Sequence, residues 1–283
     1  MSAVKMDGKA LSDKVRGSIL AETEALKKKG VTPGLAVIIV GNDPASEIYV
    51  RNKEKACAAC GFYSEKYALP AQTTQDELLG LIDQLNRSPQ ISGILCQLPV
   101  PDHISEQAVI NAIDPKKDVD AFHPVNVGRI MVGSFDFAPC TPAGVMELLD
   151  EYGIDPKGRE CVVVGRSNIV GKPMGMLLLH RHGTVTICHS RTQNLAEVCR
   201  RADILVAAVG KAGFITPDMI KDGAVVIDVG INRDANGKVC GDVDPAVMDK
   251  AAFMTPVPGG AGPMTITMLM KNTLTAAKLQ NGL

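Results

Sequence analysis

The chain has 283 residues, a formal net charge of −1, 46% hydrophobic residues and 22% charged residues. This composition is that of a folded protein with a sizeable core, in one large domain or two ordinary ones, and it does not favour disorder. The small net charge gives neither nucleic acid nor an anionic membrane an electrostatic reason to bind, and the apolar runs are far shorter than the ~20 residues that span a bilayer. Eight scattered cysteines and a start without an apolar leader segment indicate a reducing compartment, so we expect the cytoplasm.

Short apolar runs alternate with segments of helical periodicity along almost the whole chain. Unbroken runs of Val, Ile and Leu are typical of parallel strands that are covered on both faces. Six runs predict such strands: residues 35–40, 93–96, 161–164, 185–188, 204–209 and 224–229. Between them the apolar spacing predicts amphipathic helices, one of which opens with a capping-box pattern from Thr74 to Glu77. The alternation predicts an α/β protein with a parallel sheet.

A domain boundary is expected between Asp114 and Pro142. This stretch contains Pro115, Pro124 and Pro139 and shows little helical or strand periodicity. After it, strand and helix patterns alternate again, and the chain closes with a predicted helix that could complete either part. We therefore expect two α/β domains.

The segment after the third predicted strand has the composition of a phosphate-binding turn. Gly165 and Gly171 permit a tight turn and a close approach, and free N–H groups at the start of a helix expected at 174–182 would bind a pyrophosphate. The usual G-x-G-x-x-G pattern is absent, so a purely structural turn is an alternative at this point. A P-loop NTPase is excluded, because Arg166 stands where its first glycine would lie and Pro173 has no hydroxyl for Mg²⁺.

The strand that follows indicates which dinucleotide would bind. In such domains its end carries a carboxylate for the ribose of NAD, or basic groups for the 2′-phosphate of NADP. Here the strand runs into His189, Ser190 and Arg191 without a carboxylate. Ser190 can donate to a phosphate, and Arg166 and Arg191 can pair with it, although loop arginines are often merely solvated. The sequence therefore favours NADP over NAD.

Polar residues in the first half of the chain suggest a second ligand. Tyr49 and Lys53 are four residues apart in a segment expected to be helical, so they share a face. They could hold an aromatic ring and deliver a proton, or they could be an ordinary surface pair. Gln97 ends an apolar strand and is either a buried hydrogen-bonding residue or a ligand contact. Asp120 lies in the expected interdomain segment, where clefts form.

Other catalytic and metal motifs are not indicated. The pair Cys57-x-x-Cys60 has neither a second cysteine pair nor a nearby histidine, so no metal site is predicted. None of the five histidines forms an H-E-x-x-H motif, and no G-x-S-x-G elbow is present.

Five segments together resemble a known enzyme family. They are residues 47–61, 94–101, 116–129, 162–174 and 255–265, which read EIYVRNKEKACAACG, ILCQLPVP, KKDVDAFHPVNVGR, VVVGRSNIVGKPM and TPVPGGAGPMT. In this order and at this spacing they resemble bacterial methylenetetrahydrofolate dehydrogenase/cyclohydrolases, the bifunctional FolD type. The resemblance extends from the N-terminus to the last helix.

The resemblance implies two α/β domains with a cleft between them. The folate-binding catalytic domain would comprise residues 1–120 and the C-terminal helix at about 265–283. The NADP-binding domain, a Rossmann-type parallel sheet, would comprise residues 140–264, with 121–139 as a linker. The family also implies a homodimer formed through the cofactor domain, a tetrahydrofolate one-carbon derivative as substrate, and a place in one-carbon metabolism and purine biosynthesis.

The resemblance also implies roles for individual residues. Lys53 would be the catalytic lysine, Gln97 its partner, Tyr49 the residue that stacks on the folate, and Asp120 the carboxylate that anchors the pterin. The further folate-pocket positions it implies are Leu98, Pro99, Gly262 and Pro263. The cofactor contacts it implies are Gly165, Arg166, Ser167, Ser190 and Ile231, to which we add Arg191 because it follows Ser190. No metal is implied.

The implied chemistry has two steps. A hydride leaves the methylene carbon of 5,10-methylenetetrahydrofolate for NADP⁺, and water then opens the 5,10-methenyl product to 10-formyltetrahydrofolate. Hydride transfer needs alignment only, whereas ring opening needs a proton carrier, for which Lys53 is the candidate if burial lowers its pKa. Another NAD(P)-dependent dehydrogenase of this architecture, or a non-catalytic protein that binds folate or nucleotide, are the alternatives.

Overall fold

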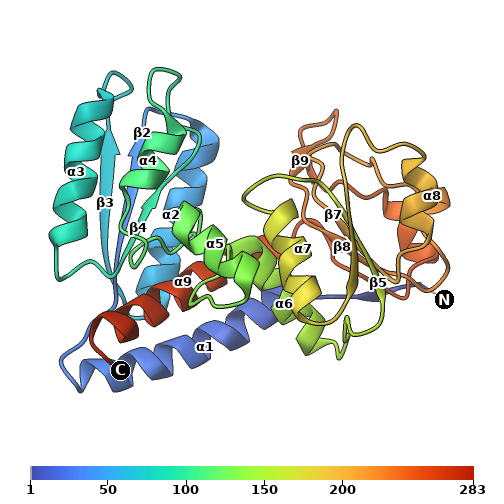
Figure 1. Cartoon of the computed structure of the whole chain (residues 1–283), viewed down its shortest axis with the longest axis horizontal. Helices are drawn as coiled ribbons and strands as arrows, with labels where there is room; N and C mark the ends of the chain where they lie inside the picture. The colour runs from blue at the N-terminus through green and yellow to red at the C-terminus, as the bar shows by residue number, and fades with distance from the viewer. Residues whose placement is uncertain (1) are drawn as a thin grey trace. The chain divides into compact units, whose positions relative to one another are not determined.

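The computed structural model describes residues 2–283, without the side chains of residues 44–46, and divides the chain into two compact units (Figure 1). The three-stranded unit comprises residues 14–140 and 266–283, and the six-stranded unit comprises the chain up to Asp13 together with residues 141–265. The bounds of the three-stranded unit differ from those of the expected folate-binding domain, which would start at residue 1 and end at residue 120. The chain start contributes a strand to the six-stranded sheet, and the expected linker carries helix α5 (Pro124–Val132).

A parallel sheet of order β3-β2-β4 forms the centre of the three-stranded unit. Its strands are β2 (Gly34–Val40), β3 (Tyr63–Leu69) and β4 (Gly93–Cys96). β2 is buried along its whole length because it pairs on both sides. The sequence pattern does not predict β3, since this edge strand is half exposed and its sequence YSEKYAL contains no apolar run.

Helices cover both faces of this sheet. α3 (Gln75–Arg87) and α4 (Glu106–Ala112) pack on one face, and α2 (Pro44–Ala59) lies on the other (Figure 1). The expected capping box of α3 is present, because Thr74 Oγ1 accepts the N–H of Glu77 while the Glu77 carboxylate accepts the N–H of Thr74. The apolar face of α3 is buried in the same core as β2 and β4, where each such side chain contributes about 1.5–3 kcal/mol.

Two longer helices, α1 (Gly8–Lys27) and α9 (Ala261–Gln280), start in the six-stranded unit and continue into the three-stranded unit. Within the latter they are joined by a hydrogen bond of 3.0 Å from Arg16 Nε to Thr267 Oγ1 and by an ion pair between Lys278 and Glu22. The C-terminal helix therefore belongs mainly to the unit that contains Lys53.

The six-stranded unit is a parallel sheet of order β1-β11-β8-β7-β5-β6. Its strands are β1 (Val4–Lys5), β5 (Glu160–Val164), β6 (Thr184–Cys188), β7 (Ile204–Ala207), β8 (Val225–Asp228) and β11 (Phe253–Met254). The chain passes from β5 to β6 on one side and then returns to place β7 on the other. This reversal is the topological switch point at which Rossmann-type sheets bind ligands.

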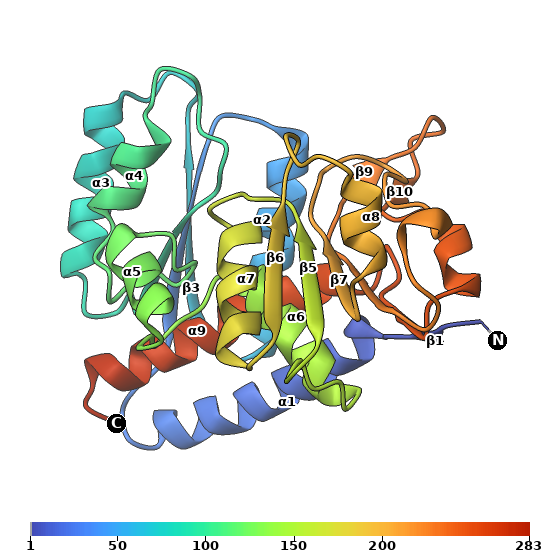
Figure 2. The ribbon, with the colours of Figure 1, turned by 45° about the vertical axis from the view of Figure 1, so that its right-hand side comes forward.

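This unit also contains α-helices between its strands and a small hairpin. They are α6 (Cys140–Glu151), α7 (Gly171–His180) and α8 (Leu195–Arg200), with the hairpin β9 (Asn232–Arg233) and β10 (Val239–Cys240). α7 lies against β5 and β6 (Figure 2). Gly175 permits this approach, because a Cβ there would lie 2.7 Å from Ile187 Cδ1. The helix begins earlier than the expected Met174, since Pro173 needs no N–H partner in a first turn.

Membrane-spanning helices, metal-binding clusters and disulfides were also sought among the described residues. Within residues 2–283, no helix has both the length and the apolar character that crossing a membrane requires. The same residues contain no group of three His, Cys, Asp or Glu side chains that could hold a metal ion. All eight cysteines are free thiols, and seven of them are buried.

Candidate active site

A lysine, a glutamine and an aspartate occupy one region of the three-stranded unit. Lys53 comes from α2, and Gln97 directly follows β4. Asp120 follows a short extended segment in which Asp118 bridges Ile94 of β4 in parallel. Parallel strands end at a common edge of the sheet, and this edge is where side chains from different segments converge on ligands.

Lys53 and Gln97 are in direct contact. Lys53 Nζ donates a hydrogen bond of 2.8 Å to Gln97 Oε1, and Gln97 Nε2 donates one of 2.8 Å to the carbonyl of Leu98. The second bond fixes the amide so that its oxygen faces the lysine. Because an amide does not titrate in this range, Gln97 orients Lys53 without competing for its proton.

Burial moves the pKa values of Lys53 and Asp120 toward neutrality. It lowers the pKa of Lys53, and the nearby charge of Asp120 opposes this shift. Burial raises the pKa of Asp120 to about 6, with Lys53 lowering it and Asp118 raising it. Burial also raises the pKa of the neighbouring Cys96 thiol to about 12, so this group is neutral. Both shifts favour the neutral form of each group, so the site holds an amine that gives up its proton more readily, and a carboxyl group that keeps its proton more readily, than the same groups in water.

The turn that carries Asp120 is fixed by its neighbour Asp118, which is 3% exposed. The Asp118 carboxylate accepts the N–H groups of Phe122 at 3.2 Å and His123 at 2.8 Å. It also accepts a bond of 2.8 Å from Asn126 Nδ2 at the start of α5. Three donors compensate the buried charge, and they hold the backbone on the C-terminal side of Asp120.

The other side of Asp120 is fixed by the C-terminal helix. Asn272 Nδ2 of α9 donates to the carbonyls of Val119 at 2.8 Å and Ala138 at 2.9 Å. The Cys140 thiol lies 3.7 Å from Asp120 Oδ1 and can donate a weak hydrogen bond to it. The sequence carries no signal for these residues, because Asn272 stands between Lys271 and Thr273 in α9 and reads as an ordinary polar position.

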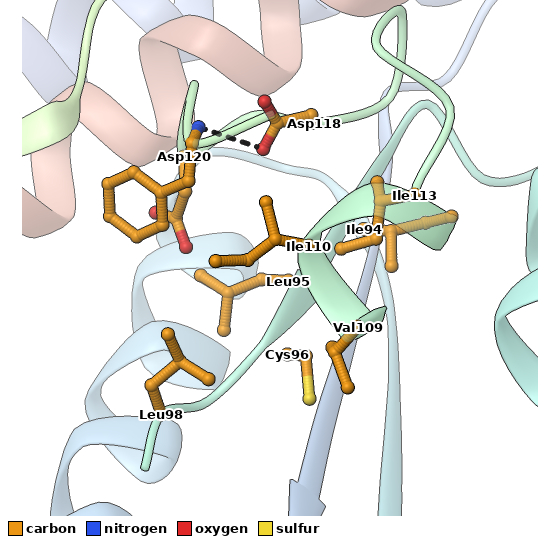
Figure 3. Close-up of a pocket in the computed structure, with 10 residues that line it drawn as sticks. Ile94, Leu95, Cys96, Leu98, Val109, Ile110, Ile113, Asp118 and Asp120 are labelled. Carbon is orange, nitrogen blue, oxygen red and sulfur yellow. Dashed lines mark hydrogen bonds between the residues drawn. The ribbon is translucent and has the colours of Figure 1, made fainter. Parts of the chain in front are cut away.

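A small cavity of about 20 Å³ lies beside Asp120 (Figure 3). Asp118 and Asp120 are its two charged lining residues, and apolar side chains such as Leu95 and Leu98 form the rest of its wall. Its volume is enough for a single water molecule. Tyr49, one helical turn before Lys53, is 38% exposed, and Pro99 follows Leu98 through a cis peptide bond.

The glycine turn of the six-stranded unit allows its backbone segments to pack closely. Gly165 has φ +138°, and a Cβ there would lie 2.2 Å from the carbonyl oxygen of Ala208. A Cβ at Gly171 would lie 2.1 Å from the carbonyl oxygen of Gly165. Both positions therefore require glycine, as the sequence pattern indicates.

The start of α7 differs from the expectation of free N–H groups. Ser167 Oγ accepts the N–H groups of Val170 at 3.1 Å and Gly171 at 3.2 Å, and the Ser167 carbonyl accepts that of Lys172 at 3.1 Å. The helix start is thus capped from within the turn. An anion at this turn would have to bind the remaining loop amides and side chains, because Ser167 already occupies the helical ones.

The basic residues lie on two neighbouring loops. β5 pairs with β6 up to Val164↔Cys188, so the loops that follow these strands leave the same edge of the sheet. Arg166 is exposed on the first loop, and Ser190 and Arg191 are exposed on the second. The donor set is cationic and hydroxylic and lacks a carboxylate, which fits the 2′-phosphate of NADP.

The remaining site residues also belong to the six-stranded unit. Ile231 follows β8 and is 52% exposed. A Cβ at Gly262 would lie 3.9 Å from Ile231 Cδ1, so these two positions are neighbours. Pro263 lies in the first turn of α9. Gly262 and Pro263 are therefore grouped with the expected cofactor contacts, whereas Tyr49 and the other expected folate contacts lie in the three-stranded unit.

A Rossmann-type sheet with a glycine turn and basic loops, joined in one chain to a partly buried lysine–glutamine–aspartate site, defines an NAD(P)-dependent enzyme that also moves protons. Residues 6–120 match the family described as tetrahydrofolate dehydrogenase/cyclohydrolase, catalytic domain, and residues 139–281 match its NAD(P)-binding domain. The chain belongs to the tetrahydrofolate dehydrogenase/cyclohydrolase family.

Known relatives are similar over their whole length. The bifunctional protein FolD of Acetivibrio thermocellus is 64% identical over 281 residues, which cover 99% of each chain. The crystal structure of the bifunctional enzyme FolD from Campylobacter jejuni has a TM-score of 0.96 and 48% identity, covering 99% of this chain and 100% of that one. The FolD of Trypanosoma brucei, solved with NADP cofactor and an inhibitor, has a TM-score of 0.95 and 40% identity, covering 100% of both chains.

Proposed function

We propose that this chain oxidises 5,10-methylenetetrahydrofolate to 5,10-methenyltetrahydrofolate with NADP⁺ and hydrolyses that product to 10-formyltetrahydrofolate. The observation that carries the proposal is the Lys53–Gln97 hydrogen bond beside Asp120, in a chain of the tetrahydrofolate dehydrogenase/cyclohydrolase family. A dehydrogenase alone would need only alignment of donor and acceptor. A partly buried lysine with a lowered pKa has a use in the second, hydrolytic step.

Lys53 is the proton carrier of the hydrolysis. Its neutral amine accepts a proton from the water that attacks the methenyl carbon, and the resulting ammonium gives a proton to the ring nitrogen as the carbon–nitrogen bond breaks. The remaining hydroxyl proton is released to solvent as the formyl C=O bond forms. The lowered pKa keeps a larger fraction of the amine neutral than an exposed lysine would have. Gln97 holds the amine in place through its Oε1 atom.

The folate is held by residues around this lysine. The Asp120 carboxylate accepts hydrogen bonds from the amino and ring N–H groups of the pterin, and the half-exposed ring of Tyr49 stacks on the folate. Leu98 and Pro99 supply apolar contacts to it. The role of Gly262 and Pro263 as further folate-pocket positions stays a prediction, because both lie in the six-stranded unit. The three-stranded unit is thus the folate-binding catalytic domain.

The six-stranded unit is the NADP-binding domain. When bound, NADP⁺ supplies the acceptor for the hydride. Gly165 and Ser167 would hold its diphosphate against the turn, and Arg166, Ser190 and Arg191 would pair with its 2′-phosphate. The exposed Ile231 offers an apolar surface to the rest of the cofactor.

Assembly and location complete the proposal. The protein forms a homodimer through the six-stranded unit, in which β6 is an edge strand with an unpaired side that could meet a second copy. It acts in the cytoplasm, where its free thiols stay reduced, and supplies formyl groups for one-carbon metabolism, including purine biosynthesis. Sedimentation analysis would test the dimer, which a monomer at micromolar concentration would refute.

One assay tests the activity. The protein is mixed with 5,10-methylenetetrahydrofolate and either NADP⁺ or NAD⁺, and the absorbance of the methenyl product is followed. We expect it to rise and then decay with NADP⁺ and to form more slowly with NAD⁺. No product despite binding of both ligands would indicate a non-catalytic protein, and no reduction of NADP⁺ with this substrate would favour another dehydrogenase.

A further inference from the structure

Two buried carboxylates lie in the six-stranded unit outside the residues discussed so far. Asp242 is 0% exposed and Asp228 is 2% exposed. Neither forms an ion pair with a lysine or arginine in the described part of the chain. Burying an ionised carboxylate is costly unless hydrogen bonds compensate it. The donors of these hydrogen bonds therefore identify the segments that each carboxylate stabilises.

Asp242 gathers four donors from two loops. Its Oδ2 atom accepts the N–H groups of Val209 at 2.5 Å and Gly210 at 3.0 Å, and its Oδ1 atom accepts that of Lys211 at 2.9 Å and Asn232 Nδ2 at 2.8 Å. Three consecutive N–H groups that converge on one point form the kind of concavity that binds an anion. Here the side chain itself is the anion, and it locks the loop after β7.

Asp228 ties the end of β8 to the same point. Its carboxylate accepts the N–H groups of Gly230 at 3.0 Å, Asp242 at 2.9 Å and Val243 at 3.0 Å. Two glycines make room for the pair: a Cβ at Gly230 would lie 2.3 Å from Asp242 Cγ, and one at Gly241 would lie 1.8 Å from Asp228 Oδ2. A side chain at either glycine would therefore displace one of the two carboxylates.

The loops held in this way border the expected cofactor contacts. Ala208, which precedes the anchored amides, donates its N–H to the carbonyl of Val164 at 2.8 Å, and its own carbonyl fills the space where a Cβ of Gly165 would lie. Ile231 directly precedes Asn232, whose amide is the fourth donor. The buried carboxylates thus join the segments that follow β7 and β8, and Ala208 links the first of these to the end of β5. This is the ligand-binding edge of a Rossmann-type sheet.

We propose that Asp242 is a positioning residue of the cofactor site, which fixes the loops after β7 and β8 in the conformation that binds NADP. The inference rests on the proposed use of NADP by this unit. Asp242 acts through the backbone amides and through Asn232, so it touches neither the reacting atoms nor the folate. Its loss affects NADP affinity and leaves hydrolysis of the methenyl compound, which needs no NADP, unchanged.

Asp242→Asn is the direct test. Each carboxylate oxygen of Asp242 accepts two hydrogen bonds. In either orientation of the asparagine amide, its NH₂ group therefore replaces an acceptor oxygen and faces two N–H donors, so two hydrogen bonds are lost. We expect the dissociation constant for NADP⁺, measured by calorimetric titration of the full-length protein, to rise about tenfold or more. Methenyltetrahydrofolate hydrolysis by the same preparation should stay within about twofold of wild type.

Asp234→Asn is the matched control. It makes the same change of charge at an exposed carboxylate in the same region of the unit, where Asp234 accepts the N–H groups of Asn236 and Lys238 in the β9–β10 turn. We expect its NADP⁺ affinity to equal that of wild type. An equal loss of affinity in Asp234→Asn would overturn the proposal, because the effect would then be one of general charge.

Each of the remaining outcomes also supports or overturns the proposed role of Asp242. An Asp242→Asn protein with normal hydrolysis and normal NADP⁺ affinity overturns the proposal. If that variant does not fold, Asn232→Ala removes one of the four bonds, and we expect about threefold weaker NADP⁺ binding; unchanged affinity there overturns the proposal as well. A wild-type protein that binds no NADP⁺ refutes the proposed function before any variant is compared, and this inference falls with it.

Discussion

Hydrolysis should depend on Lys53 more than on any other residue. Lys53→Met keeps the apolar stem and removes the amine, so we expect methenyltetrahydrofolate hydrolysis to fall by about 10²–10⁴-fold, the usual contribution of a positioned proton carrier. NADP⁺ reduction should fall less, because hydride transfer needs alignment only. Both rates can be followed by absorbance.

Lys55→Met, which replaces an exposed lysine of the same helix, is the control. A Lys53→Met protein with wild-type hydrolysis would exclude Lys53 as the proton carrier.

The pKa of Asp120 gives folate binding a defined pH dependence. Burial favours the protonated form and raises this pKa to about 6. The ionised form accepts the hydrogen bonds of the pterin, so affinity should be full above the raised pKa and fall as the pH drops through it. The effect on stability has the opposite sign, because the folded state holds this proton more tightly, and this contribution to stability is lost as the pH rises through 6.

Titration of a folate analogue between about pH 5 and about pH 8 measures this effect. The titratable groups that face Asp120 are Lys53, Cys96, Asp118 and Cys140. We expect Asp120→Asn to bind the analogue more weakly but without the step near pH 6. A wild-type affinity that stays constant over this range would contradict the raised pKa or the role of the carboxylate.

Sequence patterns can identify residues whose chemistry depends on local spacing. Tyr49 and Lys53 are an i, i+4 pair, and Gln97 is a polar residue at the end of an apolar strand, so both features are visible in the sequence. Asp118 and Asp242 carry no such signal. Their function depends on which backbone N–H groups the fold brings to them, and a buried carboxylate has the same letter as an exposed one.

At the scale of elements, the turn between β5 and α7 should tolerate no side chain at Gly171. A Cβ there would lie 2.1 Å from a backbone oxygen of Gly165, so Gly171→Ala must displace the turn. We expect NADP⁺ affinity to fall at least about tenfold, with methenyltetrahydrofolate hydrolysis retained. Gly128→Ala in α5 is the control, because a Cβ there meets no heavy atom within 4 Å. Equal NADP⁺ affinity in both variants would contradict this account of the turn.

The strands that are buried on both faces are the ones that the sequence predicts best. β2 and β7 are buried on both faces, and their unbroken apolar runs mark them in the sequence to within a residue or two. β3 lies at a sheet edge and alternates with exposed positions, so it carries no such run. β1 and β11 have two residues each, which is too short for any periodicity. Helix α5 was hidden by the prolines that suggested a linker, since Pro124 occupies the first turn, where proline is accepted.

At the scale of the whole molecule, the two units are not continuous in sequence. β1 of the chain start belongs to the six-stranded sheet, and α9 at the chain end belongs mainly to the three-stranded unit. Composition and periodicity along the chain predict a boundary between residues 114 and 142 but cannot show that each terminus returns to the other unit. That information lies in long-range contacts such as the pairing of Lys5 with Met254.

The reactivity of the cysteine thiols measures how well the side chains of both units are buried. Seven cysteines are buried, and burial raises the pKa of four of them to about 11 or 12 (Cys57, Cys96, Cys161 and Cys199). Because the thiolate is the reactive form, a disulfide reagent at about pH 8 should react rapidly with Cys240 alone in the native protein, and with all eight thiols after denaturation. Cys240→Ser should remove the rapid phase. A second rapid thiol would contradict the burial of that cysteine, and fewer than eight thiols without reductant would reveal a disulfide and argue against a reducing compartment.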